Sequence, residues 1–331
     1  MNVSSRLVHI TYAILLALLL LAPVIGLYPV FVMTLLCFAL FACAFNLLLG
    51  FTGLLSFGHA AFFGFAAYVT GWVIKTQGWT PELGVVAGAV VGGLIGLVFG
   101  VIAIRRQGIY FAMITLALAQ MVFFICLQAP FTGGEDGLQQ VPRGKLFGLL
   151  PLASDTTMYY VVAVVFVASF LGIRRIVTSP FGQVLKMIRE NEPRAVSLGY
   201  EVDRYKLLAF VLSASMAGIA GGLKTVVMGF ASLSDVHWSM SGEVILMSLL
   251  GGVGTFFGPV LGAGIVISLQ NLLADRVGAY VSVIVGAIFV VCVLAFRRGV
   301  VGELQAFMER RRSRSREARA AAPPQTKTAA H

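Results

Sequence analysis

Few side chains in this sequence combine in a pattern that would catalyse a reaction or hold a metal. The four cysteines lie inside apolar runs without the spacing of metal ligands or of a disulfide framework, and we interpret them as small packing residues: Cys37, Cys43, Cys126 and Cys292. The Gly-Lys pair that ends at Lys145 has Gln139 where a phosphate-binding loop needs its first glycine. The sequence therefore predicts no catalytic residues, no metal site and no ATP hydrolysis by such a loop.

His59 is an ionisable residue inside an apolar segment, which makes it a candidate for function. Two interpretations are open: a role in a pathway across the membrane, or a neutral imidazole bonded to a backbone carbonyl or to a serine such as Ser56. Thr115 and Gln120 pose the same question, because polar groups in membrane helices bond across helices more often than they touch a substrate. None of the 14 acidic residues lies at the centre of an apolar segment, which argues against a carrier driven by protons or sodium.

The composition places these residues in a polytopic membrane protein. Hydrophobic residues make up 59% of the chain, charged residues make up 11%, and the mean hydropathy is +0.93. Because a helical span takes about 20 apolar residues, we expect an all-α protein with about ten transmembrane or re-entrant helices. The formal charge of +10 does not indicate a nucleic-acid partner, since the basic residues cluster at the ends of apolar segments and in the C-terminal tail.

Residues 179–206 are a long charged interruption of this apolar chain. They contain nine ionisable residues: Lys186, Arg189, Glu190, Glu192, Arg194, Glu201, Asp203, Arg204 and Lys206. Placing all nine at the centre of a bilayer would cost on the order of 20 to 30 kcal/mol, so this segment lies in water. Ser179 as N-cap before Pro180 predicts one short helix, and a second helix is predicted from Asn191 to a left-handed cap at Gly199. An ordinary solvated loop and a docking element for a partner are both compatible with this pattern.

The apolar segments give the expected order of helices. They cover residues 10–27, 28–49, 50–74, 83–104, 109–128, 158–173, 207–229, 242–273 and 279–296. The first resembles a secretory signal, but no small-x-small cleavage site follows it, so we favour a retained span. The tail beyond Met308 is rich in Arg, Ser, Ala and Pro, and we expect it to be disordered. The chain thus divides into a membrane domain, residues 1–308, and a basic tail, residues 309–331.

Residues 242–273 are too many for one span and too few for two ordinary spans. The glycine-rich stretch GGVGTFFGP, residues 251–259, interrupts them in the middle. Two short helices or a re-entrant hairpin would resolve this, with the turn at membrane depth and covered by protein. We expect Gly252 and Gly254 to pack closely there, opposite the glycine-rich residues 50–64.

The distribution of lysine and arginine sets the expected orientation. Most of these residues follow apolar segments on one side, in residues 105–106, 174–206 and 297–331. The positive-inside rule makes that side cytoplasmic, together with both termini. Residues 130–157 then lie outside, either as a turn-rich loop or as a docking surface for a soluble partner.

Several stretches resemble a known family of membrane proteins. The main ones are RENEPRAVSLGYEVDRYKLLAFVLSASMAGIAGGL (189–223), NLLLGFTGLLSFGHAAFFGFAAY (46–68) and GIYFAMITLALAQMVF (108–123). Together with TGGEDGL (132–138) and GGVGTFFGPVLGA (251–263), they are similar to ABC-importer permeases for branched-chain amino acids, of the M-type (LivM) subunit. The similarity spans residues 46–296.

The resemblance implies a permease subunit in a bacterial inner membrane that translocates leucine, isoleucine or valine. It implies a second permease of the same family, two cytoplasmic ATPases that bind ATP and Mg²⁺, and a periplasmic binding protein. Residues 179–206 would be the coupling loop, and the small Ala195 side chain would set how closely an ATPase groove approaches. The implied coupling residues are Arg189, Glu190, Asn191, Glu192, Ala195, Leu198 and Gly199, and the pathway candidates are Ser56, His59, Thr115, Gln120, Gly252 and Gly254.

The coupling loop departs from the usual motif of ABC importers. That motif is roughly Glu-Ala-Ala, three residues, then Gly; here Ala195 and Gly199 match, with Pro193 and Arg194 in the first two places. The resemblance therefore supports the geometry of the loop more than each contact. The substrate is a weaker inference, because related permeases serve urea or short amides. An autonomous channel or secondary carrier is the alternative of a different class.

Overall fold

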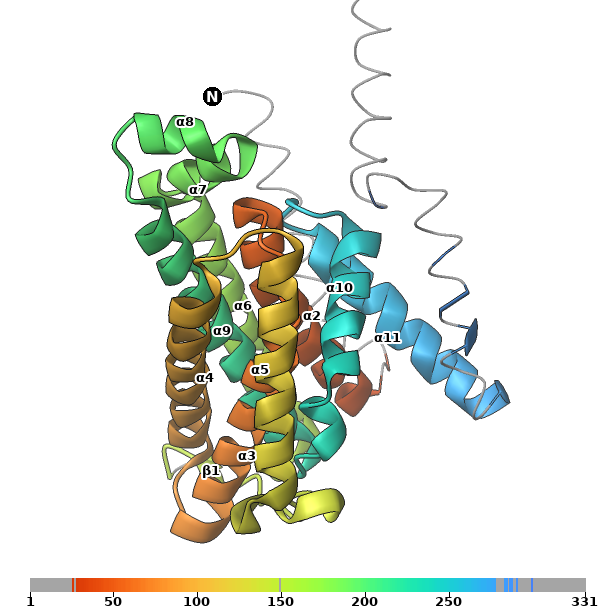
Figure 1. Ribbon diagram of the computed structural model, residues 1–331. Helices are drawn as coiled ribbons and strands as arrows, with labels where there is room; N and C mark the ends of the chain where they lie inside the picture. Colours follow the sequence, from red (N-terminus) through yellow and green to blue (C-terminus); the bar gives the residue numbers. More distant parts are fainter. Residues whose placement is uncertain are drawn as a thin grey trace, which may run out of the picture.

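The structure, a computed structural model, describes residues 26, 28–148 and 150–277, together with residues 283, 284, 286, 287, 290 and 299. Within this part the chain forms a bundle of helices (Figure 1). Five described helices are long and apolar enough to cross a membrane: α2 (Pro29–Thr52), α4 (Pro81–Ala103), α5 (Ile109–Gln128), α6 (Asp155–Thr178) and α9 (Val202–Met228). The expected all-α class is confirmed. The expected first span (10–27) and last span (279–296) lie almost wholly outside the described residues, and the tail (309–331) lies entirely outside them.

Helix α2 is the centre of the bundle. It is apolar on every face, as expected for a helix surrounded by other helices, and residues 36–48 are all buried. It packs against α9, α6 and α11 (Gly258–Val277). The helix ends where Gly53 adopts a left-handed conformation with φ of 77°, which a residue with a side chain adopts only with strain.

Helices α4 and α9 pack closely because glycine lies at their contact. Gly88, Gly92 and Gly96 recur every four residues and so share one face of α4, and this face meets Ala214 and Gly218 of α9. A Cβ atom on Gly218 would lie 2.6 Å from the carbonyl oxygen of Gly88, so the two backbones are in contact. The other face of α4 exposes aliphatic side chains, as a face in contact with lipid does: Val86, Val90, Leu94, Leu97, Val98 and Val101.

Helix α3 (His59–Gln77) starts inside the bundle rather than at its surface. Residues 53–58, between α2 and α3, are not helical, and we call them the break. The predicted apolar segment 50–74 is therefore an end of α2, the break and most of α3. This confirms that the glycines of this region permit an interruption.

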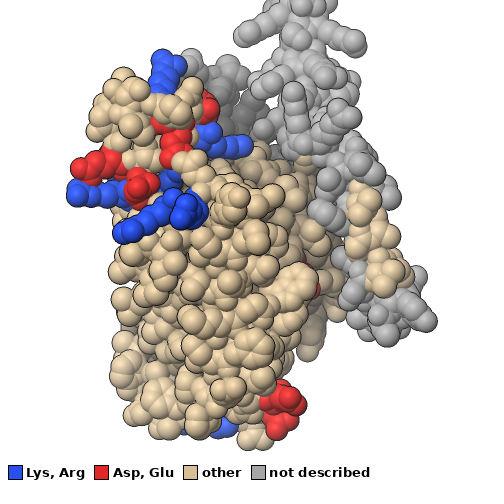
Figure 2. Space-filling view, viewed as in Figure 1, with Lys and Arg blue, Asp and Glu red and all other residues tan. Residues whose placement is uncertain are grey.

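The two ends of the bundle differ in charge. Helices α7 (Pro180–Glu190) and α8 (Glu192–Ser197) lie together at one end, at the top of Figure 1, which we call the α7 end. Figure 2 shows lysine, arginine and acidic residues gathered around these helices, above a broad surface without charge. The opposite, or far, end carries η1 (Pro130–Thr132), η2 (Gly134–Asp136), η3 (Leu233–Asp235) and a short antiparallel pair, β1 (Lys145–Leu146) with β2 (Leu150–Pro151). The layout is that of a membrane protein, with polar caps and an apolar middle.

Residues 238–277 form two helices, α10 (Trp238–Gly251) and α11. Residues 252–257 connect them, so the prediction of two helices with an interruption at the glycine-rich stretch is confirmed. The connection lies beside the C-terminal part of α2, because Asn46 bonds to both Gly254 and Thr255. Helix α11 then runs obliquely back toward the far end (Figure 1).

Candidate functional site

Helices α7 and α8 form a folded element at the α7 end, and local caps explain why. The Ser179 hydroxyl accepts a hydrogen bond from the amide of Gly182, and the Asn191 side chain accepts one from the amide of Arg194. Each cap precedes a helix with proline in its first turn, where the missing N–H costs nothing. Gly199 follows α8 with φ of 86°. The two predicted short helices, their caps and the left-handed glycine are confirmed.

This element, which we call the α7–α8 element, has a small core of its own. Ile188 of α7, Ala195 of α8 and Val202 of α9 are buried together. Ala195 has an exposed fraction of 0%, so its side chain does not face a partner. This corrects the expectation that Ala195 sets the approach of an ATPase groove: the packing of α8 onto α7 and α9 uses that face.

Polar contacts fix the α7–α8 element to the bundle. The Glu192 carboxylate accepts hydrogen bonds from Lys206 Nζ at 2.7 Å and from Gln107 Nε2 at 3.0 Å. It thereby joins α8 to α9 and to the connection between α4 and α5. The Arg189 guanidinium donates to the carbonyl oxygen of Gly50 in the last turn of α2. Arg189, Glu192 and the capping Asn191 therefore have partners within this chain, whereas they were predicted as contacts to another subunit.

The outward face of the α7–α8 element is apolar. Val196 is 58% exposed and Leu198 is 61% exposed, and Tyr200 beyond them is also exposed. Five of the predicted coupling residues lie on the exposed surface: Arg189, Glu190, Asn191, Leu198 and Gly199. Val196 was not predicted, although it directly follows the buried Ala195 and therefore points to another side of the helix. Aliphatic side chains on a water-facing loop are typical of a surface that a partner covers.

The break between α2 and α3 is held by hydroxyl groups from other elements. The amide of Phe57 donates to Thr115 Oγ1 of α5 at 3.1 Å, and its carbonyl accepts from Ser241 Oγ of α10 at 2.7 Å. Ser241 also accepts from the amide of Ala60, and Ser56 Oγ accepts from the amide of Gly58. The backbone groups of Phe57 and Gly58 thus find side-chain partners where the helix is interrupted.

His59 begins α3 and bonds to Ser213 of α9. Its Nε2 lies 2.8 Å from Ser213 Oγ, and that hydroxyl donates to the carbonyl oxygen of Ala44 at 2.6 Å. Because the hydroxyl proton is used on Ala44, Ser213 accepts from Nε2–H, and the buried Nδ1 has no described partner, as suits the unprotonated nitrogen of a neutral imidazole. The aromatic rings of Phe45 and Phe62 meet the imidazole edge to face. The histidine bonds to a serine, as the second interpretation predicted, with Ser213 rather than Ser56 as partner.

The connection between α10 and α11 packs onto the last turns of α2. Asn46 donates to the carbonyl oxygen of Thr255 and accepts from the amide of Gly254, both at 2.9 Å. Gly254 has φ of 78°, and a Cβ on Gly50 would lie 2.7 Å from its amide nitrogen. The predicted proximity of this stretch to residues 50–64 is thus present at Gly50. Gly252 is buried and Gly254 half-buried, so close packing rather than an open passage surrounds them.

The far end contains a buried ion pair. Lys224 Nζ of α9 lies 2.6 Å from Asp235 Oδ2, and the two side chains are only 7% and 4% exposed. The same carboxylate oxygen accepts from the amide and hydroxyl of Ser232. The Lys224 ammonium also lies 4.6 Å from the ring centre of Phe230. A pair with this many partners compensates charges that would otherwise be costly to bury.

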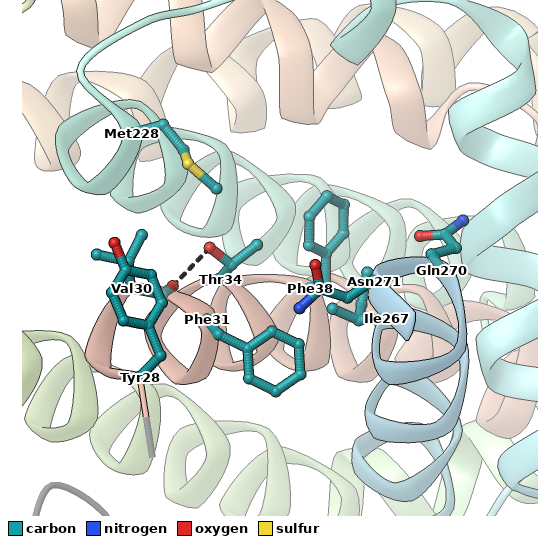
Figure 3. A pocket seen from close by; sticks show the side chains of 9 residues that line it. All are labelled: Tyr28, Val30, Phe31, Thr34, Phe38, Met228, Ile267, Gln270 and Asn271. Atoms are coloured by element: carbon teal, nitrogen blue, oxygen red, sulfur yellow. Dashed lines mark hydrogen bonds between the residues drawn. The ribbon is translucent and has the colours of Figure 1, made fainter. Parts of the chain in front are cut away.

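A cavity of about 440 Å³ opens beside the start of α2 (Figure 3). Its lining comes from α2, α9 and α11 and is mostly apolar and aromatic: Tyr28, Val30, Phe31, Thr34, Phe38, Met228, Ile267, Gln270 and Asn271. The Thr34 hydroxyl donates to the carbonyl oxygen of Val30, and the Gln270 side chain bonds to Glu243, so the Tyr28 hydroxyl and the Asn271 amide are the lining groups with no described partner. On α2, the lining residue nearest to the break is Phe38, 15 residues before the break begins, which is about 22 Å at 1.5 Å per residue.

The predicted pathway residues fall into different places. Ser56, His59 and Thr115 are fully buried and bonded within the chain, so they support the break rather than line a space. Gln120 is half-buried on α5, and its role stays a prediction. Ser213, Ser241 and Asn46 were missed, because their sequence neighbours give no sign of partners far along the chain.

A family model and several known relatives match this sequence. The model described as branched-chain amino acid transport system / permease component matches residues 28–293. The high-affinity branched-chain amino acid transport system permease protein LivM of Salmonella typhimurium is 30% identical over 258 residues, 70% of this chain and 60% of that protein. LivH of Escherichia coli, from the same kind of system, is 24% identical over 293 residues, 80% of this chain and 91% of that protein.

The third relative is named for another cargo. The autoinducer 2 import system permease protein LsrC of Klebsiella pneumoniae is 28% identical over 197 residues, 56% of this chain and 53% of that protein. The match to LivM spans about three fifths of the length of that relative, and no solved structure matches this chain. The chain belongs to the family of branched-chain amino acid transport system permease components.

Proposed function

We propose that this member of the permease family is the membrane subunit of an ATP-driven importer for the branched-chain amino acids leucine, isoleucine and valine. The observation that carries the proposal is the α7–α8 element. It is folded by its own caps, anchored through Glu192 and Arg189 to α9, α2 and the connection between α4 and α5, and apolar on its outward face at Val196 and Leu198. An element built in this way suits a rigid contact through which a partner moves the bundle.

The proposed partners follow from the importer class. They are a second permease of the same family, two cytoplasmic ATPases and a periplasmic binding protein that delivers the amino acid. The chain itself is proposed to bind no cofactor, since ATP and Mg²⁺ belong to the ATPases. The LivM and LivH names support an assembly of this kind, because both are named as components of one transport system.

The branched-chain substrate rests on the names of the relatives. A permease for urea or short amides is the nearest alternative, and the LsrC relative is named for a different cargo. An autonomous channel or carrier is the alternative of another class. It is disfavoured by the folded α7–α8 element, for which a chain working alone has no use.

The proposed location is a bacterial inner membrane, with the α7 end and both termini in the cytoplasm. The basic residues at the α7 end support this orientation (Figure 2). Ser154 at the far end and Ser197 on α8 are both exposed, so either position suits a single introduced cysteine. In intact cells Ser154→Cys should react with a membrane-impermeant thiol reagent, and Ser197→Cys should react only after permeabilisation. The opposite pattern would invert the orientation.

Uptake of labelled leucine with and without the ATPases tests the function. We expect uptake to require the ATPases and the binding protein, and to fall in Val196→Asp and Leu198→Asp together with ATPase co-purification. Gln183→Glu is the matched control, because Gln183 is an exposed polar residue of α7. Leucine uptake that persists without the ATPases would overturn the importer proposal in favour of an autonomous carrier.

A further inference from the structure

We infer that the uncovered face of the break, presented by Gly53, Leu55 and Phe57, forms part of the wall of a water-filled translocation pathway. The inference rests on the proposed transport function. It places the passage at the exposed side of the break, whereas Ser56, His59 and Thr115, predicted for the pathway, are buried and bonded within the chain. Three observations carry it: the depth of the break, its unpaired amides, and the alternation of buried and exposed residues along it.

The break descends from the α7 end into the helical layer. It begins beside α7, where a Cβ on Gly53 would lie 3.2 Å from Arg189 Cγ. It ends at Phe57, which bonds to Thr115 of α5, and at His59, which bonds to Ser213 of α9. Thr115 is six residues beyond the start of α5 and Ser213 is seven beyond Lys206, so at 1.5 Å per residue both lie about 10 Å inside the layer. The break is therefore irregular backbone at membrane depth.

Part of this backbone has no partner within the described residues. The carbonyl and amide of Phe57 and the amide of Gly58 are bonded to hydroxyl groups. The amides of Leu54, Leu55 and Ser56, in contrast, donate to no described backbone or side-chain acceptor. Unpaired amides are not tolerated against lipid, whereas they are tolerated where non-helical backbone borders a water-filled space.

The exposed residues alternate with buried ones, as in an extended segment with one face covered. Leu54, Ser56 and Gly58 are buried, while Gly53 is exposed, Leu55 is 36% exposed and Phe57 is half-buried. One face is thus packed on the bundle, and the other is only partly covered by described residues. The covered face is the one that Ser56, Thr115 and Ser241 hold, so these act as positioning residues for the wall.

The chemistry of this face fits a small amphiphilic solute. The Leu55 amide can replace water on a polar group of the solute, while the Leu55 and Phe57 side chains contact an aliphatic part. Broken membrane helices present backbone to solutes in this way in other transporters. The occupant to which the proposal commits is the hydrated pathway with its solute, rather than lipid or a tightly packed second permease.

Cysteine accessibility in the assembled importer tests the proposal. Leu55→Cys is compared with Leu54→Cys, which is buried, and with Val90→Cys, which is exposed on the aliphatic face of α4. A charged thiol reagent reacts with the ionised thiol in water, so Leu55→Cys should react at least about tenfold faster than either control. Saturating leucine should slow this reaction, and modification should block uptake. Labelling of the unsubstituted chain and the amount of each variant in the membrane are measured alongside.

Each outcome decides a different point. An unreactive Leu55→Cys means that lipid or a second permease covers the break, and it overturns the proposal. Reaction that neither slows with leucine nor alters uptake in a transporting variant also overturns it. If the unsubstituted importer carries no leucine but Leu55→Cys still reacts rapidly, the hydrated wall stands and the proposed substrate fails.

Discussion

The ion pair between Lys224 and Asp235 gives a sharp prediction about stability at the far end. Replacing Asp235 by asparagine keeps the size of the side chain and removes the charge that faces the Lys224 ammonium. Both side chains are less than a tenth exposed, at 7% and 4%, so little water can replace the lost carboxylate. The substitution also replaces the carboxylate that accepts from the amide and hydroxyl of Ser232 with a neutral amide.

The magnitude follows from the burial. Removing one partner of a buried pair typically costs about 3 to 5 kcal/mol, because the other charge stays buried and uncompensated. The pair Arg143–Asp155 has a similar length of 2.6 Å, but its side chains are 25% and 45% exposed. Breaking that pair should cost about 1 kcal/mol or less, since solvent screens the remaining charge. Burial, rather than distance, decides the difference.

Thermal unfolding of the purified importer in one detergent measures both pairs. We expect Asp235→Asn and Lys224→Met each to lower the unfolding temperature well below that of Asp155→Asn and Arg143→Met. The double variant Lys224→Met with Asp235→Asn should lose less than the sum of its single variants, because no lone charge remains. Equal losses for the buried and exposed pairs, or strictly additive losses at Lys224 and Asp235, would refute the reasoning.

Three further predictions concern the contacts around α2 and α9. Asn46→Ala removes both bonds to the α10–α11 connection and should cost about 1 to 3 kcal/mol of stability. Asn271→Ala, at an exposed position, is the control, and equal unfolding temperatures of the two variants would contradict the prediction. Gly218→Ala should reduce the amount of folded protein, because its Cβ would lie 2.6 Å from the Gly88 carbonyl oxygen, whereas Gly264→Ala meets nothing within 4 Å and should be tolerated. Arg189→Met should retain ATPase co-purification and lose uptake, and unaltered uptake would show that its bond to Gly50 is dispensable.

The sequence predicted those features that depend on near neighbours. The Ser179 cap bonds three residues ahead and the Asn191 cap does the same, so their residue types alone specify them. Gly199 was predicted as a left-handed cap because glycine adopts that conformation without strain. The apolar segments likewise gave the long helices, since length and hydropathy decide whether a helix crosses a membrane.

Contacts between distant segments were beyond such reasoning. The Ser213 partner of His59 lies 154 residues away, and Ser241 lies 181 residues from the amide of Ala60. Many serines and threonines in apolar segments have suitable hydroxyl groups, and only the packing of α9 and α10 selects these two. Ala195 is the opposite case: the spacing placed it on a helix, but which face of that helix packs on the bundle depends on α7 and α9.

Helix α2 connects the α7–α8 element with both interruptions of the helical layer. Its last turns carry Gly50, which accepts from Arg189 of α7, and Asn46, which holds Gly254 and Thr255 of the α10–α11 connection. The break starts three residues after Gly50. A displacement of α7 must therefore either break the Arg189 bond or move the end of α2, and with it the start of the break and the connection beside it. Because Leu185 and Ile188 hold α7 in packed contacts, we expect α7 and the end of α2 to move together. The contacts at Gly50 would then carry a displacement of α8 to the break.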